Sequence, residues 1–163
     1  MIVVLTGVSG VGKTTVGRLL ARELGWPFFD ADQFHPPENV AKMSRREPLS
    51  DADRQPWLRA IRDKIISLNA APQSAVITCS ALKQQYRNVL TDHGRDAHVR
   101  LVHLTGAFEL VKQRIDARKD HFMPAALLQS QFETLELPTD ALAVDVAGTP
   151  EQIVAKIRQQ LEA

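Results

Sequence analysis

A glycine-rich segment near the N-terminus holds the residues whose types and spacing best suit chemistry. The run Gly7-Val8-Ser9-Gly10-Val11-Gly12-Lys13-Thr14 fits the pattern G-x-x-x-x-G-K-[ST] in full. Glycines let the backbone curl so that its N–H groups point at phosphate oxygens, and the lysine reaches the β- and γ-phosphates. The segment therefore predicts a site for a nucleoside triphosphate, formed by Gly7, Val8, Ser9, Gly10, Val11, Gly12, Lys13, Thr14 and Thr15.

The neighbours of this loop agree with that interpretation. A hydrophobic strand is expected at Ile2–Thr6, and a helix with apolar residues at helical spacing is expected at Thr14–Leu24. A helix N-terminus adds positive potential behind the phosphates. The Thr14 hydroxyl is the expected protein ligand of Mg²⁺, and Lys13 is expected to act in catalysis as well as in binding.

The loop alone does not separate a kinase from a GTPase or a motor ATPase. No N-K-x-D motif for guanine is present, and no D-x-x-G follows the third expected strand, where Cys79-Ser80-Ala81-Leu82 stands instead. A GTPase switch is therefore disfavoured. The residues expected on the acceptor side of the site must distinguish between the remaining classes.

Asp30 and Asp32 follow the second expected strand, Phe28-Phe29, one residue apart. A kinase with a hydroxyl acceptor benefits from a carboxylate that orients the hydroxyl and accepts its proton, while another holds a water of the Mg²⁺ shell. We expect Asp32 in the first role and Asp30 in the second. The alternative is that both residues cap the turn before Pro36.

Short apolar runs alternate with amphipathic stretches along the rest of the chain. Helices are expected at Glu38–Ser44, Asp51–Leu68, Leu82–Leu90, Phe108–Arg118 and Ala125–Leu135, strands at Ala75–Cys79, His98–Leu104 and Leu142–Val146, and a closing helix from Pro150. Strands that alternate with helices predict one α/β domain over residues 1–163, a three-layer sandwich around a parallel sheet. In such folds the ligands bind at the carboxyl ends of the strands.

Basic side chains in the middle of the chain suit an acidic, polyhydroxylated acceptor. Lys83 and Arg87 are four residues apart after the third strand, and Arg54 opens the preceding helix, so the three are expected to clamp a carboxylate. A solvated helix face is the alternative for Lys83 and Arg87. His35, His121 and Gln131 are expected to hydrogen-bond sugar hydroxyls.

Several stretches resemble the gluconate kinases, which are shikimate-kinase-like P-loop kinases. The stretches are Phe28 to Pro36, Glu47 to Leu58, Cys79 to Arg87, and Arg118 to Phe122 together with Ser130 to Glu136. The resemblance is colinear over nearly the whole chain. It implies phosphorylation of the 6-hydroxyl of D-gluconate by ATP, a five-stranded parallel sheet in the order 2-3-1-4-5, a mobile lid and a homodimer.

The resemblance also implies roles for two arginines of the helix before the lid. Arg114 is expected to stack on adenine and Arg118 to meet the transferring phosphoryl group, although the order can be reversed. The lid itself is expected at Lys119–Met123. Asp120 departs from the family, where many members have glycine at this position.

Composition excludes several other classes. Twenty basic residues against nineteen acidic ones give a formal charge of +1, which predicts no general attraction to nucleic acid or a membrane surface. No apolar run is long enough to span a bilayer, no signal peptide is recognised, and the single Cys79 is expected in the core. We therefore expect a cytoplasmic protein. Three alternatives stay open: a kinase for shikimate or another aldonate, a nucleoside-monophosphate kinase, and a nucleotide-gated binding module without turnover.

Overall fold

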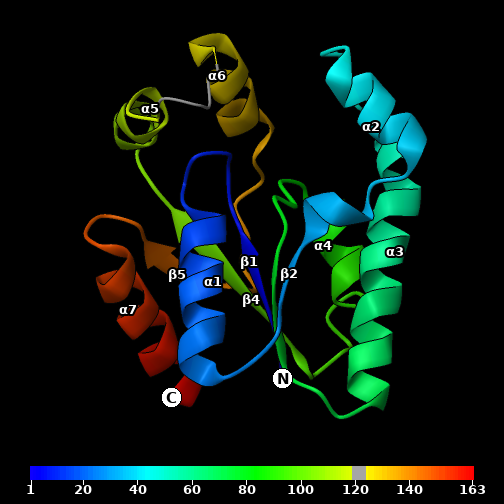
Figure 1. Ribbon diagram of the computed structural model, residues 1–163, viewed down its shortest axis with the longest axis vertical. Helices are drawn as coiled ribbons and strands as arrows, with labels where there is room; N and C mark the ends of the chain where they lie inside the picture. Colours follow the sequence, from blue (N-terminus) through cyan, green and yellow to red (C-terminus); the bar gives the residue numbers. More distant parts are fainter. Residues whose placement is uncertain (119–123) are drawn as a thin grey trace.

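The computed structural model describes residues 1–118 and 124–163, which form a parallel sheet between two layers of helices (Figure 1). The five strands lie in the order β2-β3-β1-β4-β5, as expected. They are β1 (Ile2–Thr6), β2 (Phe28–Asp30), β3 (Ala75–Thr78), β4 (Val99–Thr105) and β5 (Leu142–Asp145).

At least one helix separates each strand from the next strand along the chain, as the crossover connections of parallel strands require. The helices are α1 (Lys13–Leu24), α2 (Pro37–Ser44), α3 (Asp51–Ala70), α4 (Gln84–Leu90), α5 (Phe108–Asp116), α6 (Ala125–Thr134) and α7 (Pro150–Glu162). Helices α1 and α7 pack together on one face of the sheet, and α3 and α4 on the other. The chain after β2 forms one turn of 3₁₀ helix at Ala31–Phe34, with the Asp30 carboxylate accepting from the Asp32 N–H.

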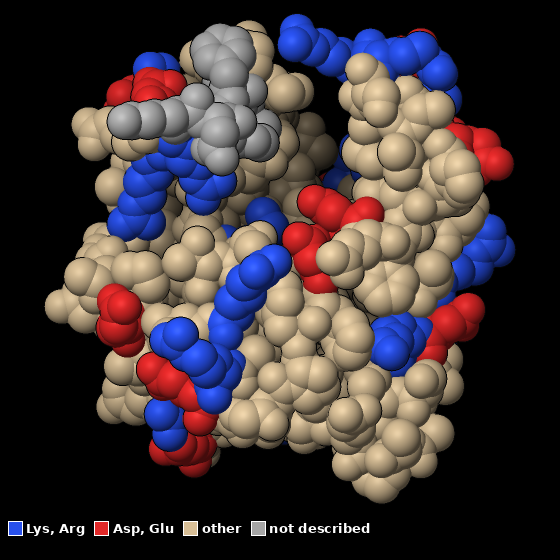
Figure 2. All heavy atoms as spheres, in the orientation of Figure 1, with Lys and Arg blue, Asp and Glu red and all other residues tan. Residues whose placement is uncertain are grey.

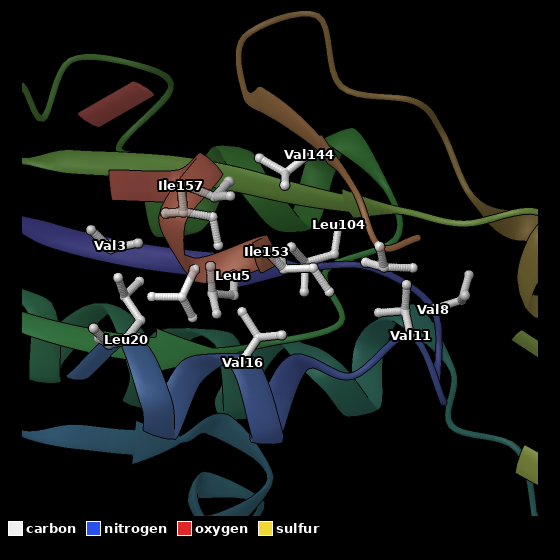
Figure 3. Close-up of a cluster of buried hydrophobic side chains, with 14 of the residues drawn as sticks. Val3, Leu5, Val8, Val11, Val16, Leu20, Leu104, Val144, Ile153 and Ile157 are labelled. Carbon is white, nitrogen blue, oxygen red and sulfur yellow. The ribbon is translucent and has the colours of Figure 1, made fainter. Parts of the chain in front are cut away.

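The central strand β1 belongs to two hydrophobic cores at once. Its side chains alternate, so that Val3 and Leu5 pack beneath α1 and α7 (Figure 3), whereas Ile2 and Val4 pack beneath α3. This follows from the two-residue repeat of a strand. All five residues of β1 are buried, so the segment that leads into the glycine-rich loop is held from both faces.

Helices α2, α5 and α6 stand at the end of the sheet where the glycine-rich loop lies (Figure 1). This is the carboxyl end of the strands, where ligands bind in parallel α/β sheets. Within the described part of the chain, none of the helices has the length and apolar character needed to cross a membrane.

A buried histidine lies directly below this end of the sheet. His103 on β4 is 2% exposed, and its Nδ1 is 3.0 Å from the Thr6 hydroxyl of β1. Burial lowers the pKa of His103 to about 4, and the positive charges of Arg87 and Lys13 act in the same direction. His103 is therefore neutral in the folded protein at pH 7.

This histidine predicts an acid-sensitive contribution to stability. Because the unfolded chain binds a proton near pH 6.5 and the folded chain only near pH 4, the free energy of unfolding falls as pH decreases through this window. We expect a loss of about 2 kcal/mol from His103 between pH 7 and pH 5. Urea denaturation of the wild type and His103→Gln at both pH values measures it: the wild type should lose about that much more than the variant, and equal losses would contradict the assignment.

Candidate active site

The glycine-rich loop curls between β1 and α1 around the side chain of Lys13. The Lys13 ammonium donates to the carbonyl oxygens of Gly7 at 2.9 Å and Val8 at 3.0 Å. Gly10 and Gly12 have φ values of 79° and 100°, which L side chains rarely adopt, and a Cβ on Gly10 would lie 2.4 Å from Ile115 of α5. The loop is thus both tightly curled and packed against α5.

Removal from water lowers the pKa of Lys13 to about 8, against the raising effects of Cys79, Asp32 and Asp30. Lys13 therefore remains mainly cationic at pH 7. The Cys79 thiol is buried, and burial raises its pKa to about 12, so it is neutral and fits the expected core role.

A cleft of about 240 Å³ opens in front of this loop. Its lining brings together most of the residues expected at the phosphates: Ser9, Gly10, Gly12, Lys13, Thr14, Asp30, Asp32, Thr78, Cys79, Ser80 and Arg118. Figure 2 shows this side of the molecule hollowed beside a group of acidic side chains, with Lys and Arg side chains around it. We call it the phosphate cleft.

The two carboxylates expected at the acceptor hydroxyl both reach the phosphate cleft. Desolvation by the surrounding protein raises the pKa of Asp32, the charge of Asp30 adds to this, and Lys13 opposes it. Asp30 is fixed, because its Oδ1 accepts from the Asp32 N–H at 3.0 Å. The Asp32 side chain has no such tie among the hydrogen bonds of the described residues, and it is exposed to the cleft.

A second cleft, of about 260 Å³, lies on the other side of the loop and is mainly apolar. Gly12 and Thr15 form one wall, Gly148 and Pro150 another, and both Arg114 and Arg118 line it. Arg114 donates to the carbonyl oxygens of Val146 at 2.6 Å and Gly148 at 3.3 Å, so it braces the wall that the β5–α7 connection supplies. We call this the base cleft, since its mainly apolar lining suits a nucleotide base.

Arg118 lines both the phosphate cleft and the base cleft. It lies two residues beyond the end of α5, which is shorter than expected, and its N–H still donates to the Ile115 carbonyl at 3.0 Å. The expected lid, Lys119–Met123, and with it the expected ligand His121, lie outside the described residues.

A third cleft, of about 410 Å³, adjoins the phosphate cleft, and Ser80 lines both. Its charged lining residues are Arg54, Lys83 and Asp51, and Ser130 and Thr134 of α6 close another side. The Asp51 carboxylate accepts from Lys83 at 3.1 Å and from the Tyr86 hydroxyl. We call this the acceptor cleft.

Arg54 is held in place at the wall of the acceptor cleft. It donates to the Leu49 carbonyl at 2.7 Å, and its guanidinium lies 5.5 Å from the centre of the Tyr86 ring. The hydrogen bonds from Tyr86 and then Lys83 lower the pKa of Asp51 to about 2. The cleft therefore carries two cations and one anion near pH 7.

His35 lies behind the acceptor cleft and does not line it. Its ring stacks on Trp57, with centroids 4.3 Å apart, and its Nδ1 accepts from the Asn39 amide at 3.2 Å. An amide nitrogen only donates, so the neutral ring carries its proton on Nε2. Burial, and then the charge of Arg54, lowers the pKa of His35.

Arg87 does not join Lys83 in a clamp, which corrects the expected geometry. Helix α4 begins at Gln84 and not at Leu82, so Lys83 is its N-cap and the two side chains do not share a helical face. Arg87 is completely buried and donates to the carbonyl oxygens of Ala81, Leu82 and Glu136. It connects the chain after α6 to the chain before α4. We therefore propose no role for Arg87 in substrate binding.

Gln131 also has a partner that the sequence did not suggest. Its Oε1 accepts from the Ser9 N–H at 2.7 Å, and its Nε2 donates to the Ser9 hydroxyl at 3.0 Å. It therefore contacts the glycine-rich loop and lines none of the three clefts.

Sequence reasoning assigned no role to Asp51, Tyr86 or Ser80. Asp51 precedes Arg54 by three residues at the start of a helix, and Tyr86 follows Lys83 by three, so spacing alone offered a signal for a shared surface. Ser80 gave no such signal, because its place between two clefts depends on the packing of three segments.

The same arrangement of sequence and fold recurs in known proteins. The family model described as shikimate kinase matches residues 9–162. The gluconokinase of Gluconobacter oxydans (strain 621H) is 49% identical over 84% of this chain and 76% of its own, and the probable gluconokinase of Xenopus tropicalis is 42% identical over 99% and 94%. The crystal structure of a gluconokinase from Sinorhizobium meliloti 1021 superimposes with a TM-score of 0.83 at 40% identity, covering 98% of this chain and 94% of that one.

Proposed function

The chain belongs to the shikimate kinase family, with gluconokinases as relatives over nearly its whole length. From this premise we propose that it is an ATP-dependent kinase that phosphorylates D-gluconate to 6-phospho-D-gluconate. The phosphotransferase class agrees with the glycine-rich loop, Lys13 and the neighbouring carboxylates, which meet in one cleft.

The observation that carries the proposal is the continuity of the three clefts. Arg118 joins the base cleft to the phosphate cleft, and Ser80 joins the phosphate cleft to the acceptor cleft. A nucleotide with its base in the first and its triphosphate in the second directs its γ-phosphate toward the third. An acceptor hydroxyl near Ser80 would then lie beside the γ-phosphate, where the two clefts adjoin.

Three side chains are proposed to act on the reacting atoms. The acceptor hydroxyl gives its proton to the Asp32 carboxylate as its oxygen attacks the γ-phosphorus, and the bond to the β-phosphate oxygen breaks to leave ADP. Lys13 and Arg118 bring positive charge to the oxygens on which negative charge develops.

Magnesium is the proposed cofactor of the reaction. Among the described residues no group of three or more His, Cys, Asp and Glu is placed to hold a metal ion. The donor set of Thr14 and Asp30 at the phosphate cleft nevertheless fits Mg²⁺, which binds through one or two protein oxygens, phosphate oxygens and water. When bound, the ion neutralises charge on the phosphates. Thr14 is proposed as a direct ligand and Asp30 as a ligand of its water.

The lining of the acceptor cleft supports a monocarboxylate as acceptor. Arg54 and Lys83 carry two positive charges and Asp51 one negative charge, so the charged lining residues leave one positive charge for the substrate. Ser130 and Thr134 add hydroxyls that can hydrogen-bond a polyol chain. A neutral sugar would leave that positive charge without a partner.

An acceptor panel tests the proposed function. Coupled ADP release with Mg²⁺-ATP should respond strongly to D-gluconate and at least tenfold less to shikimate, other aldonates, neutral sugars and nucleoside monophosphates. A stronger response to shikimate or another aldonate would replace the acceptor and keep the reaction class. Silence toward every acid would overturn the assignment of the acceptor cleft.

Two further properties are proposed with this function. The family resemblance supports a homodimer, which sedimentation equilibrium at micromolar concentration would test. A cytoplasmic location is proposed because the reaction consumes ATP, and fractionation of the source cells would test it.

A further inference from the structure

Helix α6 is a wall of the acceptor cleft and a neighbour of the phosphate-binding loop at the same time. Ser130 and Thr134 face the acceptor cleft, while Gln131 between them forms two hydrogen bonds to Ser9 of the loop. Ser9 in turn lines the phosphate cleft. The contact joins residues 122 positions apart in the chain.

The hydrogen bonds between Gln131 and Ser9 are reciprocal and specific. The amide oxygen accepts from the Ser9 N–H, and the amide nitrogen donates to the Ser9 hydroxyl, so both polar atoms of the Gln131 side chain are hydrogen-bonded. A neutral amide fixes the loop without placing a negative charge beside the phosphates. A carboxylate could accept the same N–H, but it would repel them.

The C-terminal part of α6 and the residues just after it are anchored to two other parts of the site. Beyond its C-terminus, the Glu136 carboxylate accepts from the Gln84 N–H at 2.7 Å, next to Lys83 of the acceptor cleft. On its other side, Phe132 packs edge-on against Phe108 of α5, with ring centroids 5.5 Å apart. A displacement of α6 would therefore move residues at the acceptor cleft, in the loop and in α5, the helix that leads to Arg118.

We propose that Gln131 is a positioning residue that couples the acceptor cleft to the phosphate-binding loop. An acceptor held against Ser130 and Thr134 fixes α6, and the two hydrogen bonds of Gln131 then hold Ser9 and the adjoining loop in one conformation. The triphosphate binds to a loop that is already ordered. Acceptor and nucleotide thereby strengthen each other's binding, because such coupling is reciprocal.

Calorimetric titration measures this coupling directly. The probe is the non-hydrolysable analogue AMPPNP with Mg²⁺, titrated into the full chain with and without saturating D-gluconate. We expect gluconate to tighten binding to the wild type about fivefold or more. In Gln131→Leu the ratio should fall to within about twofold of one, and the KM for ATP at saturating gluconate should rise by a similar factor.

Two further variants keep the experiment decisive. Gln129→Leu removes an exposed glutamine of the same helix that bonds only to Glu133 among the described residues, and it should keep the wild-type ratio. Ser9→Ala removes the hydroxyl partner and leaves the backbone N–H, so an intermediate ratio is expected. It also serves as the measurement if Gln131→Leu does not fold.

The coupling rests on the proposed function, and the outcomes separate the two. A wild type that does not phosphorylate gluconate would overturn the proposed function. A wild type that turns over gluconate but shows no coupling, or a Gln131→Leu variant with the wild-type ratio, would overturn the coupling alone. A higher KM for gluconate in Gln131→Leu with an unchanged ratio would instead assign Gln131 to direct acceptor contact.

Discussion

Arg118→Ala is expected to lower kcat for gluconate phosphorylation by roughly 10³- to 10⁵-fold. Arg118 lines both the phosphate and the base cleft, so its guanidinium is placed to meet charge that develops on the transferring group. An arginine in this role stabilises the transition state more than the bound substrates. The KM for gluconate should therefore change much less than kcat. Rapid-quench or coupled steady-state assays give both constants.

Lys112→Met is the matched control for Arg118→Ala. It removes a cation from α5, the helix that precedes Arg118, where Lys112 pairs with Asp116 at 3.1 Å on the surface. We expect activity within about twofold of the wild type, because surface pairs contribute little. If Arg118→Ala also stayed within tenfold, the arginine would have no part in the transition state, and Arg114 would be the next residue to test.

Asp32→Asn is expected to lower kcat by roughly 10²- to 10⁴-fold, the usual range for loss of a general base. The amide keeps the size of the side chain but accepts no proton. Affinity for AMPPNP should change little, since Lys13 and the loop N–H groups are the proposed phosphate ligands. The pH profile provides a second measurement: the raised pKa of Asp32 predicts an acid limb in kcat/KM for the wild type, with activity lost as pH falls.

The variant should lose that acid limb as well as rate. Asp63→Asn is the control, because Asp63 is exposed on α3 and lines none of the three clefts. It should keep both the rate and the limb. Near-normal turnover by Asp32→Asn would remove the general-base role and leave Asp32 as a residue that binds the acceptor.

The phosphate-binding loop and the alternation of helices and strands could be predicted from the sequence because both depend on near neighbours in the chain. The loop residues are consecutive, and β1 and α1 that flank it show their own hydrophobic repeats. The strand order came from family resemblance and is confirmed. Asp30 and Asp32 could be grouped with Lys13 because the segments that carry them follow β2 and β1, whose carboxyl ends lie at the same edge of the sheet.

The acceptor cleft was harder to predict, since its geometry depends on where a helix begins and which way long side chains turn. Spacing placed Lys83 and Arg87 on one face, but the helix starts after Lys83 and Arg87 turns toward three carbonyl groups. The Asp51–Lys83 contact crosses 32 residues, and the Gln131–Ser9 contact crosses 122. Neither contact produces a periodic pattern in the sequence from which it could be predicted.

The burial of β1 on both faces bears on how enzymes of this architecture can diversify. The glycine-rich loop follows directly after β1, which packs into both hydrophobic cores. Most substitutions in β1 therefore disturb folding and catalysis together. The acceptor cleft is assembled from the start of α3, the segment around Ser80 and one side of α6, which lie outside that strand. New acceptor preferences can therefore arise by exchanging peripheral side chains while the machinery for the common co-substrate is inherited intact.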